Sequence, residues 1–205
     1  MTTAEQNVDS VPEGTVIRRS RWLAITAIMT ALALVGNYAL VAIPNVELGS
    51  CILFTTAYVF GLVMAVWCTL MMSVLFSVFN PWGSFVPQIW FSQLLGWLLM
   101  DLVGAIMGHN TQERQKRTGY LELGIVGAVV TVFFDLITDL GFSWTLGLPY
   151  TETVIIGLPF MIVHVTSNAI IFGTLIPCVD YIIQHSLRSR IWEQTVQEMP
   201  VLSEG

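Results

Sequence analysis

Acidic, imidazole and amide side chains recur at helical spacing within the apolar C-terminal half of the chain. Asp135 and Asp139 lie one turn apart with Thr131 a turn before them, and His164 and Asn168 are also four residues apart. An aspartate inside an apolar span costs about 2.5 to 3.5 kcal/mol unless it is paired, protonated or in contact with water. These groups can bind a polar solute or relay protons, and we favour a solute pocket for Asp135 and His164. Hydrogen bonding between helices stays open for Asn168, and interfacial solvation for Asp139.

Tryptophans and a glutamine share a second predicted helix face. Trp90, Gln93 and Trp97 lie at i, i+3 and i+7, and Asp101 continues the face at i+11. Aromatic rings beside an amide suit a flat heterocycle that both stacks and hydrogen-bonds. We expect Asp101 at the cytoplasmic end of its helix, outside any pocket.

A turn precedes that face. The sequence Asn80-Pro81-Trp82-Gly83 favours chain reversal, because Asn-Pro and a nearby glycine mark turns. Asn80 and Trp82 therefore join the candidate binding residues. Trp82 has a plainer explanation too, since tryptophans gather at membrane interfaces without any ligand.

Several functional classes lack their signatures. The single lysine, Lys116, follows a glutamine, so the chain holds no Gly-Lys phosphate loop and cannot be its own P-loop ATPase. The three cysteines have no CxxC spacing, and no histidine has a second histidine at i+3 or i+4. The sequence therefore predicts neither a cofactor nor a metal site. We expect the cysteines to be core thiols. The net charge of -6 gives no indication of nucleic-acid binding.

Composition places the candidate residues in a membrane. The 205 residues are 55% hydrophobic and only 11% charged, and no charged side chain lies between Glu47 and Asp101. About 18 consecutive apolar residues already predict a membrane span. The sequence therefore predicts an all-α integral membrane protein, multi-pass in the cell membrane, with a six-helix domain at 18–185 between a disordered cytoplasmic tail, 1–17, and a cytoplasmic C-terminal tail, 186–205.

The cationic residues indicate the topology, because positively charged loops stay in the cytoplasm. All eight fall within three short segments, 18–21, 114–117 and 188–190, so an even number of spans must separate them and both termini are cytoplasmic. Six transmembrane helices satisfy this if the uncharged stretch 50–79 holds two short ones with a reversal near 61–65. The remaining spans are predicted at 22–43, 88–107, 121–140 and 154–184, and the outward connections at 44–49, 80–87 and 141–153.

A strip of small residues marks the first span. Ala24, Ala27 and Ala31 lie at i, i+3 and i+7, and Ala27-x-x-x-Ala31 is a spacing that lets helices approach closely in lipid. A partner helix is the functional interpretation, and the frequency of alanine in membrane helices is the alternative.

The chain resembles the substrate-binding S components of energy-coupling factor (ECF) transporters over about residues 20–185. The resemblance rests on six short helices, the alanine strip, Pro44-Asn45-Val46-Glu47-Leu48, the Asn80-Pro81-Trp82-Gly83 loop and Gln93-x-x-Gly96-Trp97. It implies a non-catalytic capture subunit that binds a vitamin or related heterocycle near its outer face. The partners it implies are a transmembrane coupling subunit, docked at Ala27 and Ala31, and two ATPase subunits. It also implies capture by Asn80, Trp82, Gln93, Trp97, Asp135, Asp139 and His164.

Residue 2 and the segment 141–144 bear on the choice among functions. The cobalt and nickel members of that family carry a histidine after the initiator methionine, whereas this chain has Thr2, which argues against a metal substrate. Two alternatives remain: an intramembrane serine hydrolase, because Gly141-Phe142-Ser143 with His164 resembles rhomboid proteases, and a proton-coupled carrier that uses Asp135. The hydrolase motif departs from the rhomboid pattern at Trp144, where those proteases have glycine.

Overall fold

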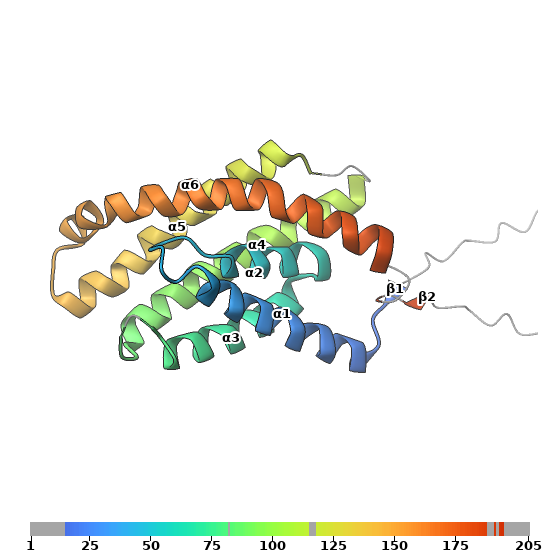
Figure 1. Cartoon of the computed structure of the whole chain (residues 1–205), viewed down its shortest axis with the longest axis horizontal. Helices are drawn as coiled ribbons and strands as arrows, with labels where there is room; N and C mark the ends of the chain where they lie inside the picture. Colours follow the sequence, from blue (N-terminus) through green and yellow to red (C-terminus); the bar gives the residue numbers. More distant parts are fainter. Residues whose placement is uncertain (1–14, 82, 115–117, 188–190, 192, 195–205) are drawn as a thin grey trace, which may run out of the picture.

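The computed structural model of the chain describes residues 15–81, 83–114, 118–187, 191 and 193–194, and these are almost wholly helical (Figure 1). In chain order the helices are α1 (Arg19–Ala39), α2 (Gly49–Phe60), α3 (Leu62–Val78), α4 (Pro87–Arg114), α5 (Tyr120–Leu146) and α6 (Tyr150–Ile182). A short π-helical segment, η1 (Ile183–Leu187), prolongs α6. The predicted all-α class is confirmed for the described residues.

Two short strands, one before α1 and one after α6, meet at one end of the bundle. Strands β1 (Thr15–Val16) and β2 (Glu193–Gln194) pair antiparallel beside the cytoplasmic ends predicted for the first and last spans (Figure 1). The two strands lie within the predicted tails, 1–17 and 186–205. Most residues of these tails lie outside the described part of the chain.

Within the described part of the chain, four helices, α1, α4, α5 and α6, are long and apolar enough to cross a membrane. The 21 residues of α1 span about 32 Å, close to the roughly 30 Å of a bilayer's hydrocarbon core. Large apolar side chains cover their outward surfaces, including the exposed Ile28 on α1 and the exposed Ile155 and Ile162 on α6. Because such a surface is unfavourable in water and suits lipid, the protein is membrane-embedded.

The two remaining helices are short, as the uncharged stretch predicts. Gly61 ends α2 and precedes α3 with φ +90°, a left-handed backbone conformation that glycine adopts without a steric penalty. The 12 residues of α2 and 17 of α3 measure about 18 and 26 Å. Ten residues of α2 are buried, and α1, α3, α4 and α6 all contact it, so α2 forms the centre of the bundle.

The predicted connection at 141–153 is wrong. Helix α5 continues to Leu146 and α6 begins at Tyr150, leaving only Gly147–Pro149 between them. Gly141 does not break α5 because it packs against α4: a Cβ there would collide with Ser92. Gly147, at φ +67°, caps α5 instead. Helix α1, in contrast, ends at Ala39, four residues earlier than predicted.

Two predictions about single residues also fail. Asp101 lies in the middle of α4, fully buried, where its carboxylate accepts a hydrogen bond of 2.7 Å from Thr69 on α3. Its partner on the next helix allows it to sit inside the bundle instead of at a helix end. Cys51 and Cys68 are buried as predicted, but Cys178 is exposed.

Candidate solute-binding cavity

A cavity of about 810 Å³ lies among the helix ends remote from the paired termini. Its walls come mainly from α3, α4, α5 and α6, and Asn37 of α1, Ser50 of α2 and the α1–α2 and α3–α4 connections contribute further lining residues. The volume lies within the range of about 300 to 1,000 Å³ typical of small-molecule sites. The lining mixes aromatic rings with a few carboxylates and amides, which is the composition of a site for an organic solute.

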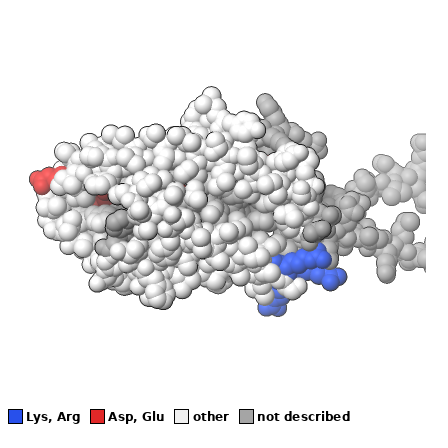
Figure 2. Space-filling view, in the orientation of Figure 1, with Lys and Arg blue, Asp and Glu red and all other residues white. Residues whose placement is uncertain are grey.

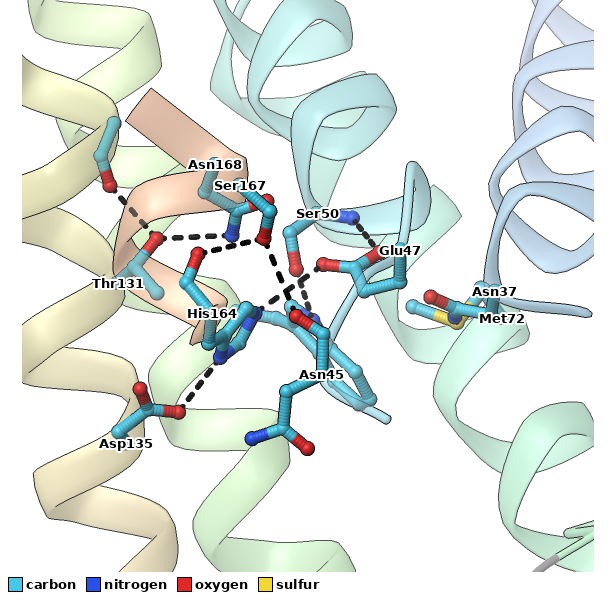
Figure 3. Close-up of polar contacts among 12 residues, drawn as sticks. Asn37, Asn45, Glu47, Ser50, Met72, Thr131, Asp135, His164, Ser167 and Asn168 are labelled. Atoms are coloured by element: carbon cyan, nitrogen blue, oxygen red, sulfur yellow. Dashed lines mark hydrogen bonds and ion pairs between the residues drawn. The ribbon is translucent and has the colours of Figure 1, made fainter. Parts of the chain in front are cut away.

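His164 on α6 is the centre of the polar wall. Its Nδ1 is 2.8 Å from Asp135 Oδ1 on α5, and its Nε2 is 3.7 Å from Glu47 Oε1 in the α1–α2 connection (Figure 3). Only 5% of His164 is exposed. The imidazole thus joins two segments that are distant in sequence, and both of its neighbours are carboxylates.

The α1–α2 connection is held against α6 by polar contacts. Glu47 Oε2 accepts a hydrogen bond of 2.8 Å from the Ser50 backbone N–H, and the Ser167 hydroxyl donates to the Asn45 carbonyl oxygen at 3.3 Å (Figure 3). Burial acts to raise the pKa of the Glu47 carboxyl, but the polar contact with His164, the charge of His164 and the hydrogen bonds with Ser50 outweigh burial and lower the pKa. Glu47 therefore favours the charged form.

Trp97 forms a fixed aromatic wall. Its indole N–H donates to Ser50 Oγ at 3.0 Å, and its ring packs between those of Phe76 and Phe134 with centroids 6.4 and 5.4 Å away. Only 3% of the residue is exposed. The predicted face is present, since Gln93 and Trp90 also line the cavity, but the N–H of Trp97 is already bonded to the protein.

Of the eight residues predicted to bind a solute, six line this cavity: Asn80, Gln93, Trp97, Asp135, Asp139 and His164. Trp82 lies outside the described residues. Asn168 does not line the cavity; it is fully buried, and its side-chain amide donates to Thr131 Oγ1 on α5 at 2.9 Å. The structural interpretation of Asn168 therefore accounts for its position.

Asp139 differs from Asp135 in its partners. Asp135 has His164, whereas the Oδ2 atom of Asp139 is buried and has no hydrogen-bond partner among the described residues. The Asp139 carboxylate faces Gly157 of α6, where a Cβ would come within 3.4 Å of both oxygens. With α5 extended to Leu146, Asp139 lies about two turns from the helix end and not at its edge.

Sequence reasoning did not assign Glu47 or Ser50 to the site. Both line the cavity, and Glu47 contacts His164 across the bundle. One signal was available: Glu47 is the last charged residue before an uncharged stretch that continues to Asp101. Its role depends on the fold of the α1–α2 connection, which the sequence pattern does not specify.

The residues of the two remaining predicted sites lie elsewhere. Ala27 and Ala31 are exposed on α1, opposite the buried face formed by Thr26, Thr30 and Ala33. Ser143 does not line the cavity, and its hydroxyl donates to the Leu148 carbonyl oxygen at 2.7 Å. The imidazole of His164 is bonded to Asp135 instead of Ser143.

The chain matches no protein-family model, no curated protein and no solved structure. The functional argument therefore rests on the geometry of the cavity and on the surface of the bundle.

Proposed function

We propose that this protein captures a small organic solute in the membrane, as the S component of an ECF-type importer. In this proposal all six helices cross the bilayer, both termini are cytoplasmic, and the cavity opens toward the outer face. The solute is a vitamin or related heterocycle. A separate coupling subunit with two ATPase subunits moves it inward.

The cavity carries the proposal. Four side chains that line it each hold a buried polar atom without a hydrogen-bond partner in the described part of the chain: Trp90 Nε1, Asp135 Oδ2, Thr138 Oγ1 and Asp139 Oδ2. An unsatisfied buried polar group costs about 1 to 3 kcal/mol. So many beside one cavity is expected of a site whose partner is a bound molecule.

The outer surface of α1 supports the role of a subunit that docks to others. Ala24, Ala27 and Ala31 are exposed along one strip, flanked by the exposed Ile28 and Leu32. Small side chains at this spacing let a second helix approach closely. The strip lies outside the cavity, because Asn37, near the C-terminal end of α1, is the one described residue of that helix in the lining. This separation suits a subunit that binds its solute and its partner independently.

The pairing of β1 with β2 supports an even number of crossings, because it brings the two termini to the same end. The described cationic side chains also lie at that end (Figure 2). Under the positive-inside rule that end is cytoplasmic and the cavity end faces outward.

Capture accounts for the observed contacts better than the two alternatives do. The hydrolase requires Ser143 and His164 in hydrogen-bond contact, whereas each is bonded to another residue. A proton-coupled carrier would use Asp135, whose Oδ1 is hydrogen-bonded to His164. Proton transfer through Asp135 alone gives no reason for the large cavity and its aromatic lining.

The experiment is to purify the protein from cells in detergent, denature it, and identify the released small molecules by mass spectrometry. We expect one heterocyclic compound in near-stoichiometric amount, and binding of that compound to the emptied protein by calorimetry. A fluorophosphonate label on Ser143 that is lost in Ser143→Ala, with no released solute, would favour the hydrolase instead.

A further inference from the structure

We infer that the solute is an organic cation and that Asp139 is the carboxylate that pairs with its positive charge. This inference rests on the proposed capture function. It goes beyond that function because it specifies the charge of the solute, the residue that selects it, and the compounds that the site rejects.

The first step is the charge balance of the cavity. Glu47, Asp135 and Asp139 all line it, and His164 is the one group among the described lining residues that can carry a positive charge. Even a protonated His164 leaves two of the three carboxylates uncompensated. The described Lys and Arg side chains lie at the opposite end of the molecule, as Figure 2 shows for one face. A carboxylate or phosphate on the solute would therefore be repelled, and a cation attracted.

The second step is the difference between the carboxylates. Glu47 accepts a hydrogen bond from the Ser50 N–H and contacts His164, and Asp135 is bonded to His164. Asp139 has neither kind of partner among the described residues, and its Oδ2 is shielded from solvent. A carboxylate oxygen held away from water needs a counter-charge or a hydrogen-bond donor. Asp139 is therefore the group left for the ligand.

The third step concerns the kind of cation. The described residues contain no group of three His, Cys, Asp or Glu side chains arranged to hold a metal ion. The cavity is instead large and rich in aromatic rings, with Trp90, Phe142 and Phe160 in its lining. Aromatic faces attract organic cations, so a heterocycle with an alkylated or protonated nitrogen fits this lining better than a small metal ion does.

The test uses the full chain in detergent, emptied of solute, and a defined equimolar mixture of small heterocycles at neutral pH. The mixture contains matched triads, such as the 1-methylnicotinamide cation, neutral nicotinamide and the nicotinate anion, together with water-soluble vitamins of each charge. Compounds retained after washing are released by denaturation and quantified by mass spectrometry. Calorimetry then measures the dissociation constant of each retained compound.

We expect cations to be retained and their anionic analogues to be excluded. Asp139→Asn should weaken the binding of a cation with an N–H donor about 10- to 150-fold, the effect of losing one hydrogen bond to a charged group. It should also weaken the binding of an N-alkylated cation, through the loss of the negative charge, and change the binding of any neutral compound much less. Asp139→Glu, which keeps the charge, should retain the preference for cations. Glu152→Gln is the matched control, because Glu152 is an exposed carboxylate at the start of α6 that does not line the cavity. It should bind cations as the parent does.

The outcomes separate this inference from the proposed function. Retention of neutral or anionic compounds alone overturns the inference and leaves solute capture standing. An equal loss of cation and neutral binding in Asp139→Asn overturns the role of Asp139, since that pattern indicates a collapsed cavity. Retention of no compound of any class overturns both the inference and the capture function.

Discussion

His164 and Asn168 lie one turn apart on α6, yet they belong to two different regions of the molecule. His164 borders an open cavity, between carboxylates from α5 and from the α1–α2 connection. Asn168 is enclosed in the middle of the bundle and donates to Thr131 of α5, and Asp101 is enclosed in the same way with Thr69. The comparison shows that depth and residue type do not distinguish a binding group from a group that links helices. What distinguishes the two groups is whether the side chain borders a cavity.

The largest effect should come from the cavity side of this comparison. We expect His164→Ala to cost about 3 to 5 kcal/mol of stability, because it leaves Asp135 and Glu47 as buried charges without their shared partner. The α1–α2 connection would also lose its contact with the imidazole, so solute binding should become undetectable. The measurements are the melting temperature in detergent and the affinity for the co-purified solute. An unchanged melting temperature would show that the three side chains do not hold the cavity wall together.

The enclosed region should respond in stability alone. Asn168→Ala removes one buried hydrogen bond and leaves a small void, at a cost of about 1 to 3 kcal/mol. The variant should melt at a lower temperature yet bind the solute as tightly as the parent. Thr131→Val, which removes the acceptor of the same bond, is the matched variant. A fall in affinity with unchanged melting temperature would place Asn168 in the binding site and erase the distinction.

Removal of the Trp97 indole N–H should have a smaller effect on stability and affinity. Trp97→Phe keeps an aromatic ring but removes the N–H that bonds Ser50, a loss of about 0.5 to 1.5 kcal/mol. Because α2 and α4 are joined by this bond at the cavity, we expect a slightly lower melting temperature and up to about 10-fold weaker binding. Ser50→Ala should reproduce the result. A much larger loss of affinity in Trp97→Phe than in Ser50→Ala would indicate that the indole touches the solute directly.

A substitution in the exposed alanine strip on α1 should change neither the melting temperature nor the solute affinity of the isolated protein. Ala27→Leu adds a side chain to an outward surface, so melting temperature and solute affinity should match the parent. Uptake in cells that contain the coupling and ATPase subunits should fall to background, because the larger side chain holds the partner helix away. Ile28→Leu, on the same exposed surface, is the control for a change of side chain without added volume. Normal uptake by Ala27→Leu would leave the alanines as ordinary lipid-facing residues.

The sequence predicts the parts of this protein that depend on local patterning. The absence of charge between Glu47 and Asp101 and the length of 50–79 were enough to place two short helices with a break at Gly61. Polar residues in apolar segments identified Gln93, Asp135, Asp139 and His164, because a buried polar group is costly wherever it is placed. The aromatic spacing and the Asn-Pro turn added Trp97 and Asn80, and all six line one cavity.

What the sequence does not predict depends on contacts between helices. The sequence alone places Gly141 in a loop, because its close packing against Ser92 of α4 is visible only in the structure. It places Asp101 at a helix end, because the hydrogen bond with Thr69 is likewise visible only in the structure. The same limit applies to the two aspartates of α5. Depth alone predicts that Asp135→Asn weakens binding more than Asp139→Asn. Because Asp135 is hydrogen-bonded to His164 whereas the buried Oδ2 of Asp139 has no hydrogen-bond partner among the described residues, we expect the reverse order.

The pairing of β1 with β2 has a practical consequence for handling the protein. Because β1 and β2 lie side by side, attachment of the molecule to a support at either strand holds it by the same end and presents the cavity to the surrounding solution. Fluorescent labels placed within β1 and β2 would start close together, and their energy transfer would report separation of the strands. That readout is distant from the solute and would leave the cavity lining unmodified.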